Sequence, residues 1–115
     1  MQTTTAFDKQ KCAAVEQAVM QVLDCNLHEI VNFPDTFSKK VVVFVLSKFY
    51  DFDKRNIGQA YQMTYLYVPT VVDEMEFRLL TDWKFREQIS LILNKLNYAA
   101  KVDFIGNRIA SKAMA

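Results

Sequence analysis

Apolar residues recur at steps of three and four near both ends of the chain, over residues 7–23 and 83–101. This spacing places apolar side chains on one face of a helix. The stripes comprise Cys12, Val15, Val19, Val22 and Leu23 in the first segment and Phe85, Ile89, Ile92, Leu93 and Leu96 in the second. We therefore predict an amphipathic helix in each segment, the second capped by Thr81 or Asp82.

A different pattern occupies the middle of the chain, where residues 41–46 read VVVFVL and are apolar at every position. β-branched residues also favour strands. However, the pattern indicates no partner strand elsewhere, and an isolated strand could not satisfy its backbone hydrogen bonds. We predict a helix over residues 39–50, capped by Ser38, which should be the central and most buried one because it is apolar on nearly every side.

Shorter elements flank this central helix. A turn is expected at residues 27–31, followed by a break around Pro34. Asp53 is placed to cap a helix over residues 54–61, in which Ile57 and either Ala60 or Tyr61 face inward. Pro69 suits the first turn of a helix over residues 69–80, where its missing N–H costs nothing. The inner side of that helix is predicted to carry Val72, Met75 or Glu76, and Leu79.

Length and composition agree with this pattern. The 115 residues suit one domain, and 51% of them are hydrophobic and 23% charged, as in ordinary globular proteins. Only two glycines and two prolines are present, which favours long helices over loop-rich folds. We expect an all-α protein, a compact bundle of about five helices with a helix-turn-helix-like centre, in one domain with flexible ends at residues 1–6 and 107–115.

The compartment follows from what the sequence lacks. Residues 1–5 have neither the basic nor the apolar region of a signal peptide, and no apolar run approaches the roughly 20 residues of a membrane span. Cys12 and Cys25 are too few and too irregularly spaced for a disulfide framework or a zinc site. We expect two reduced thiols in a cytoplasmic protein that does not interact with membranes.

Candidate catalytic chemistry is sparse. His28 is the single histidine, and Cys25 would share a helix face with it, but no third group is placed to orient them. Gly58 and Gly106 stand alone, so no glycine-rich phosphate loop is present. We therefore expect a protein that is not an enzyme and that needs neither a cofactor nor a metal.

Two short helices joined by a compact turn, after an apolar helix and before a long one, form the layout of a helix-turn-helix. The order of residues over 38–96 resembles the C-terminal, origin-binding domain of the bacterial replication initiator DnaA. The resemblance is carried by Lys39 before the apolar helix, Tyr50 at its end, Asp53, Ile57-Gly58, Tyr61, Thr70-Val71, Asp82-Trp83-Lys84-Phe85-Arg86 and Asn94-Lys95-Leu96. It implies a DNA-binding module that replication-related systems, including phages and mobile elements, could encode.

The residues with which that family contacts DNA are missing from this sequence. The family's turn carries an Arg-Asp-His triplet before Thr-Val, whereas residues 65–69 read YLYVP. The turn is also about two residues longer, and the following helix about three shorter. Asp73, Glu74 and Glu76 on the expected recognition helix would repel a phosphate backbone. The formal net charge of +1 is low for a DNA-binding domain.

Two functional hypotheses remain open. In the first, the protein binds double-stranded DNA with little sequence specificity, through Lys39, Lys40, Lys54, Arg55, Thr70 and Arg78. The alternative for these basic residues is an ordinary solvated face. In the second, the same scaffold binds a protein partner or itself through the aromatic segment Tyr65, Leu66 and Tyr67. The alternative for that segment is a turn tucked against the core. A homodimer is compatible with either hypothesis.

Overall fold

A computed structural model describes residues 6–32 and 36–96 and confirms the all-α fold. The helices in this part of the chain are α1 (Lys9–Leu23), α2 (Leu27–Val31), α3 (Phe37–Lys48), α4 (Lys54–Ala60), α5 (Tyr67–Thr81) and α6 (Trp83–Lys95). The extra helix is α2, which was expected as a turn. Asn26 and Glu29 form a capping box around its first turn, since each side chain accepts a hydrogen bond at 3.0 Å from the other residue's backbone N–H.

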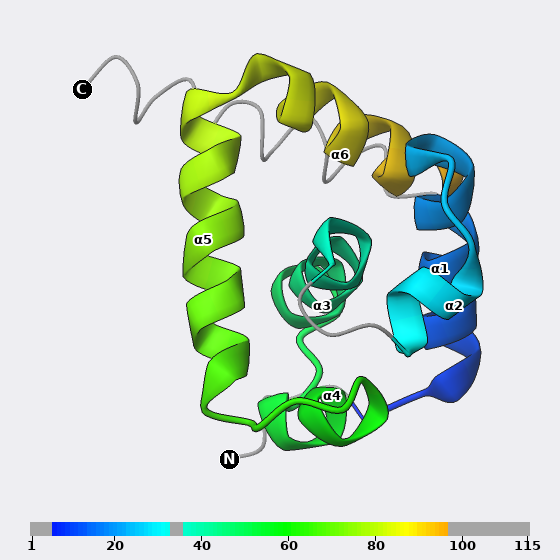
Figure 1. The fold of residues 1–115 in the computed structure, drawn as a ribbon, viewed down its shortest axis with the longest axis vertical. Helices are drawn as coiled ribbons and strands as arrows, with labels where there is room; N and C mark the ends of the chain where they lie inside the picture. Colours follow the sequence, from blue (N-terminus) through cyan, green and yellow to red (C-terminus); the bar gives the residue numbers. More distant parts are fainter. Residues whose placement is uncertain (1–5, 33–35, 97–115) are drawn as a thin grey trace.

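Helix α3 lies at the centre of the molecule, as its apolar sequence predicts. Every side chain from residue 41 to residue 46 is fully buried. In Figure 1 this helix is seen nearly end-on, with α5 on one side, α1 and α2 on the other, α6 above and α4 below. The segment from residue 41 to residue 46 is enclosed on all sides and has no room for a polar face, which explains why it is apolar at every position.

The start of α3 differs from the expectation that Ser38 would cap it. Thr36 is the N-cap, and its Oγ1 accepts a hydrogen bond from the backbone N–H of Lys39 at 3.2 Å. The same hydroxyl donates to the carbonyl oxygen of Glu29 at 2.9 Å, which ties α3 to α2. Ser38 is buried within the first turn. Thr36 has the same capping chemistry two residues earlier and gains this second bond.

Helix α5 begins at Tyr67, two residues before the expected start at Pro69. The first four N–H groups of a helix have no partner within it, so a proline in the third position still costs no hydrogen bond. Met75 and Leu79 face inward as expected, but Glu76 does not, and Val72 is only half-buried. The earlier start adds Val68 to the buried face, and Val71 also lies on that face.

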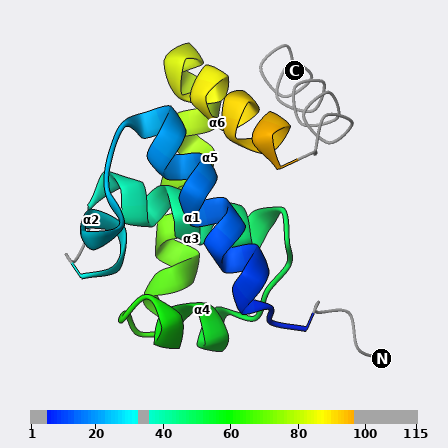
Figure 2. The same cartoon turned by 90° about the vertical axis from the view of Figure 1, so that its right-hand side faces the viewer.

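The two amphipathic helices, α1 and α6, pack against each other and complete the shell (Figure 2). Asp82 caps α6 by accepting hydrogen bonds from the N–H groups of Lys84 and Phe85 at 3.0 and 3.3 Å. Phe85 reaches the core, with its ring centroid 6.5 Å from that of Phe44 in α3. The remainder of the helix expected over residues 83–101, and most of the ends expected to be flexible, lie outside the described residues.

Candidate nucleic-acid interface

The corner between α4 and α5 depends on Gly58 and Gln62. A Cβ atom added at Gly58 would lie 2.6 Å from the carbonyl oxygen of Met63, too close for any other residue without backbone movement. The N–H of Met63 donates to the carbonyl oxygen of Gly58 at 2.9 Å, and Gln62 adopts a left-handed conformation with φ 59°. This is a Schellman ending of the helix. Gly58 therefore permits the close approach of the turn to α4.

Lys39, expected to contact DNA, is instead part of the core. Its side chain is 2% exposed, and its Nζ donates to the carbonyl oxygen of Tyr61 at 2.8 Å. Tyr61 is the C-cap of α4, where free carbonyls and the helix dipole favour a positive charge. The expectation that Lys39 meets a phosphate backbone is wrong, because the α4–α5 turn covers it.

Tyr61 anchors the same turn from its side chain. Its hydroxyl donates to Glu16 Oε2 of α1 at 2.5 Å. Burial raises the pKa of Tyr61 far above its usual range, and the negative charge of Glu16 adds to the shift. Of the two inward-facing alternatives, Tyr61 is the buried residue, whereas Ala60 is exposed. The α4–α5 corner is thus fastened to α3 through a carbonyl and to α1 through a hydroxyl.

The other lysines of α3 are paired with acidic residues of α5. Lys40 Nζ lies 3.1 Å from Glu74 Oε1, and Lys48 forms an ion pair with Glu76. These contacts change the interpretation of both helices. Lys40 is engaged before any phosphate arrives, and two of the three carboxylates expected to repel DNA have a cation beside them.

Lys54 and Arg55 remain exposed in the first turn of α4. Both cations lie over the ring of Tyr65 in the following turn, with Arg55 Cζ at 4.3 Å and Lys54 Nζ at 5.7 Å from its centroid. Such cation–π contacts hold long side chains in place while their charges still face water. Asp53 stands at the N-cap of α4, although its side chain makes no capping hydrogen bond.

The two remaining candidate DNA contacts, Thr70 and Arg78, lie far apart on α5. Thr70 is exposed in the first turns of the helix, close in sequence to Tyr65. Arg78 lies eight residues later, about 12 Å along the axis. There its guanidinium stacks over Phe37 at 5.1 Å and lies 4.0 Å from Asp82. The structure therefore groups Lys54, Arg55 and Tyr65, which we call the corner face. Thr70 is exposed at the start of α5, and Arg78 lies outside the corner face.

The aromatic segment at residues 65–67 divides in the same way. Leu66 is 67% exposed, Tyr65 lies beneath the two cations, and Tyr67 packs partly against the core. A continuous apolar surface is therefore not formed by these three residues. Tyr67 fits the alternative of a turn tucked against the core, whereas Leu66 is exposed, as the protein-interface hypothesis requires.

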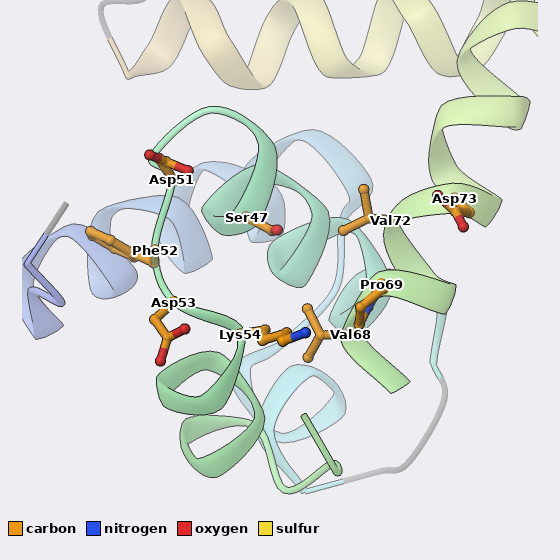
Figure 3. Close-up of a pocket in the computed structure, with 9 residues that line it drawn as sticks. All are labelled: Ser47, Asp51, Phe52, Asp53, Lys54, Val68, Pro69, Val72 and Asp73. Atoms are coloured by element: carbon orange, nitrogen blue, oxygen red, sulfur yellow. The ribbon is translucent and has the colours of Figure 1, made fainter. Parts of the chain in front are cut away.

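A shallow hollow of about 330 Å³ borders the corner face (Figure 3). Lys54 extends across it toward Val68 and Pro69, while the carboxylates of Asp53 and Asp73 lie at opposite sides. The hollow forms where the end of α3, the connection after it and the start of α5 meet. It was missed by sequence reasoning because it depends on how three elements converge.

Both cysteines are free, as expected, and neither is activated. Burial raises the pKa of the Cys12 thiol and of the Cys25 thiol. A raised pKa lowers the thiolate fraction and hence the reactivity of a thiol. Within residues 6–32 and 36–96, no group of three His, Cys, Asp or Glu side chains is placed to hold a metal ion.

Comparison with protein-family models, curated proteins and solved structures gives no match. In the described part of the chain, each helix is too short or too polar to cross a membrane. The geometry of the corner face therefore provides the basis for a functional proposal.

Proposed function

We propose that the protein is a non-catalytic, double-stranded-DNA-binding module of the helix-turn-helix type, with weak sequence specificity. Its corner face would meet the phosphate backbone through Lys54 and Arg55, and Thr70, exposed at the start of α5, would add a further contact. The observation that carries the proposal is the pair of exposed cations held over Tyr65 at the helix-turn-helix corner. The resemblance of residues 38–96 to the DnaA origin-binding domain supports the same surface, and an origin-related role in a phage or mobile element is part of this proposal.

Weak specificity follows from the residue types on α5. Base readout in the major groove relies on Arg, Lys, Asn or Gln reaching base edges. The exposed residues of its first half are Pro69, Thr70, Asp73 and Glu74, and Glu74 pairs with Lys40. A threonine hydroxyl can contact either a phosphate or a base, so most of the binding energy would come from phosphate contacts.

The test is binding of the full chain to random duplex DNA, followed by fluorescence anisotropy over a series of salt concentrations. Affinity should fall steeply with salt, because phosphate contacts release counterions. Lys54→Glu with Arg55→Glu should abolish binding. Lys95→Glu reverses an exposed charge in the last turn of α6, the helix that lies across α3 from α4 (Figure 1). It serves as the control and should retain most of the affinity.

A wild-type protein that does not bind at low salt would refute the proposal. Equal losses in Arg55→Glu and Lys95→Glu would show that net charge alone drives association. Retained affinity in Arg55→Lys combined with a loss in Tyr65→Ala would show that the aromatic ring positions the cations.

A second candidate function, binding of a protein partner, is favoured by Leu66. Its side chain is 67% exposed at the tip of the α4–α5 corner, where an apolar residue gains nothing from the fold. If DNA binding fails while Leu66→Asp leaves the stability of the monomer unchanged, this surface becomes the primary candidate for a protein interface.

A further inference from the structure

The outer face of α6 carries two large apolar side chains that are exposed in the part of the chain that the structure describes. Trp83 is 65% exposed and Leu91 is 51% exposed. The other face of the helix supplies Phe85, Ile89, Ile92 and Leu93 to the core. Within residues 6–32 and 36–96, the core therefore does not depend on Trp83 or Leu91.

Trp83, Glu87 and Leu91 follow one another at intervals of four residues, with Lys84 one turn before Glu87. Rows at this interval form the ridges that interdigitate in the commonest class of helix crossing. The apolar pair lies about 12 Å apart along the helix axis, with Glu87 midway between its members. The row has an apolar residue at each end and one charged residue, Glu87, in the middle.

We propose that this face binds a second copy of the chain, with the two α6 helices crossing antiparallel about a two-fold axis near Glu87. In that arrangement Trp83 of each copy packs against Leu91 of the other. A two-fold interface requires such reciprocal contacts between residues of one patch.

Charge complementarity identifies the second copy as the occupant. The side chains of Lys84 and Glu87 are exposed, and neither forms an ion pair within the described residues. With the two-fold axis at Glu87, Lys84 of each copy is displaced by about 4.5 Å along the helix from Glu87 of the other. A lysine side chain spans that displacement, so each of the two carboxylates at the axis is within reach of a lysine. The α6 face lies at the opposite end of the molecule from α4, so the corner face stays open in the dimer (Figure 1).

The experiment is sedimentation equilibrium of the full 13.4 kDa chain without DNA, from micromolar to millimolar concentration. The mass should rise from that of a monomer to that of a dimer. Trp83 is the only tryptophan, so its fluorescence should shift to shorter wavelength in parallel as the ring leaves water. Trp83→Ala should raise the dimer Kd by about thirtyfold, as truncation of a central interface tryptophan does.

Charge-swap variants test the geometry. Lys84→Glu and Glu87→Lys should each weaken self-association, because each gathers four like charges at the axis. An equimolar mixture of the two should form heterodimers, and the double variant Lys84→Glu/Glu87→Lys should dimerise like the wild type. Phe77→Ala is the matched control, since it removes an equally exposed aromatic side chain from α5.

A wild type that stays monomeric at every concentration overturns the proposal. Single charge variants that dimerise like the wild type, or a double variant that fails to recover, also overturn it. Because no DNA is present, these outcomes are independent of the proposed DNA binding.

Discussion

Two pairs of neighbouring cations in this protein have opposite surroundings. Lys39 and Lys40 lie in the first turn of α3, and Lys54 and Arg55 lie in the first turn of α4. The first pair is enclosed, by the carbonyl oxygen of Tyr61 on one side and by Glu74 on the other. The second pair is exposed and rests on Tyr65. Position within a helix does not decide whether a lysine is available to a partner. What packs over that end of the helix decides it.

Lys39→Ala against Lys54→Ala tests this contrast most directly. Removing Lys39 leaves a cavity and an unpaired carbonyl at Tyr61, so we expect the free energy of unfolding to fall by about 3 kcal/mol. Lys54→Ala should change it by less than about 0.5 kcal/mol, as at most surface positions. Urea denaturation followed by far-UV circular dichroism measures both. Lys39→Met, which preserves most of the volume, should cost less than Lys39→Ala, and equal effects at positions 39 and 54 would contradict the contrast.

Gly58→Ala should disturb the surroundings of both cation pairs. The turn that follows Gly58 carries the Tyr61 carbonyl, which binds Lys39, and the Tyr65 ring, which lies under Lys54 and Arg55. The added methyl group would meet the Met63 carbonyl oxygen at 2.6 Å, so the turn must move. We expect a loss of about 2 kcal/mol, in the range of other overpacked sites. Gln59→Ala on the exposed side of the same helix is the control and should be neutral or slightly stabilising. A neutral Gly58→Ala would show that the turn is loose.

Tyr61→Phe should change how the free energy of unfolding depends on pH. Burial raises the pKa of Tyr61 in the folded state, whereas the unfolded side chain ionises near its ordinary pKa of about 10. The unfolded state therefore releases the proton first, and stability falls as pH rises above about 10, by up to about 1.4 kcal/mol per pH unit. Tyr61→Phe should lack this part of the fall. The comparison is made with Cys12→Ala in both proteins, because the Tyr61 hydroxyl hydrogen-bonds the Cys12 thiol and influences its pKa, whereas the Cys25 thiol titrates in both proteins and cancels in the difference. Parallel stability curves for the two proteins would contradict a buried, neutral Tyr61.

The smallest effect is expected for the Lys40–Glu74 ion pair. Its partners are 18% and 41% exposed, so water screens the attraction. A double-mutant cycle with Lys40→Ala and Glu74→Ala should give a coupling of about 0.5 kcal/mol, which decreases with added salt. A cycle between Lys54 and Glu74, for which no contact is seen, should give none. Equal coupling in both cycles would mean that the pairing is not specific.

The spacing of apolar residues predicts the helices, because a helix that buries one face needs apolar residues at regular intervals along its own sequence. The fully apolar run at residues 41–46 leads to the central helix, and the stripe of α6 leads to its packing face. The same reasoning did not predict that Thr36 caps α3 or that Lys39 is buried. Both depend on residues that are close only after folding, Glu29 in one case and Tyr61 in the other.

The site was predictable only in part for the same reason. Lys54 and Arg55 could be proposed as surface cations from their position next to a capping residue. Their shared contact with Tyr65 could not, since the tight return at Gly58 brings that ring back to α4. The exposure of Trp83 also escaped notice, because an aromatic residue at the start of a helix is as compatible with the core as with the surface.

The corners after α1, α3 and α4 are made by Asp24, Asp51 and Gln62, each with a positive φ between 55° and 59°. Glycine would adopt this conformation without strain, but it would also give the denatured chain more freedom to lose on folding. A residue with a side chain seldom visits this conformation in the denatured ensemble. We therefore expect the corners not to nucleate folding and to be imposed when the flanking helices dock. Helix docking rather than turn formation would then set the rate at which this protein folds.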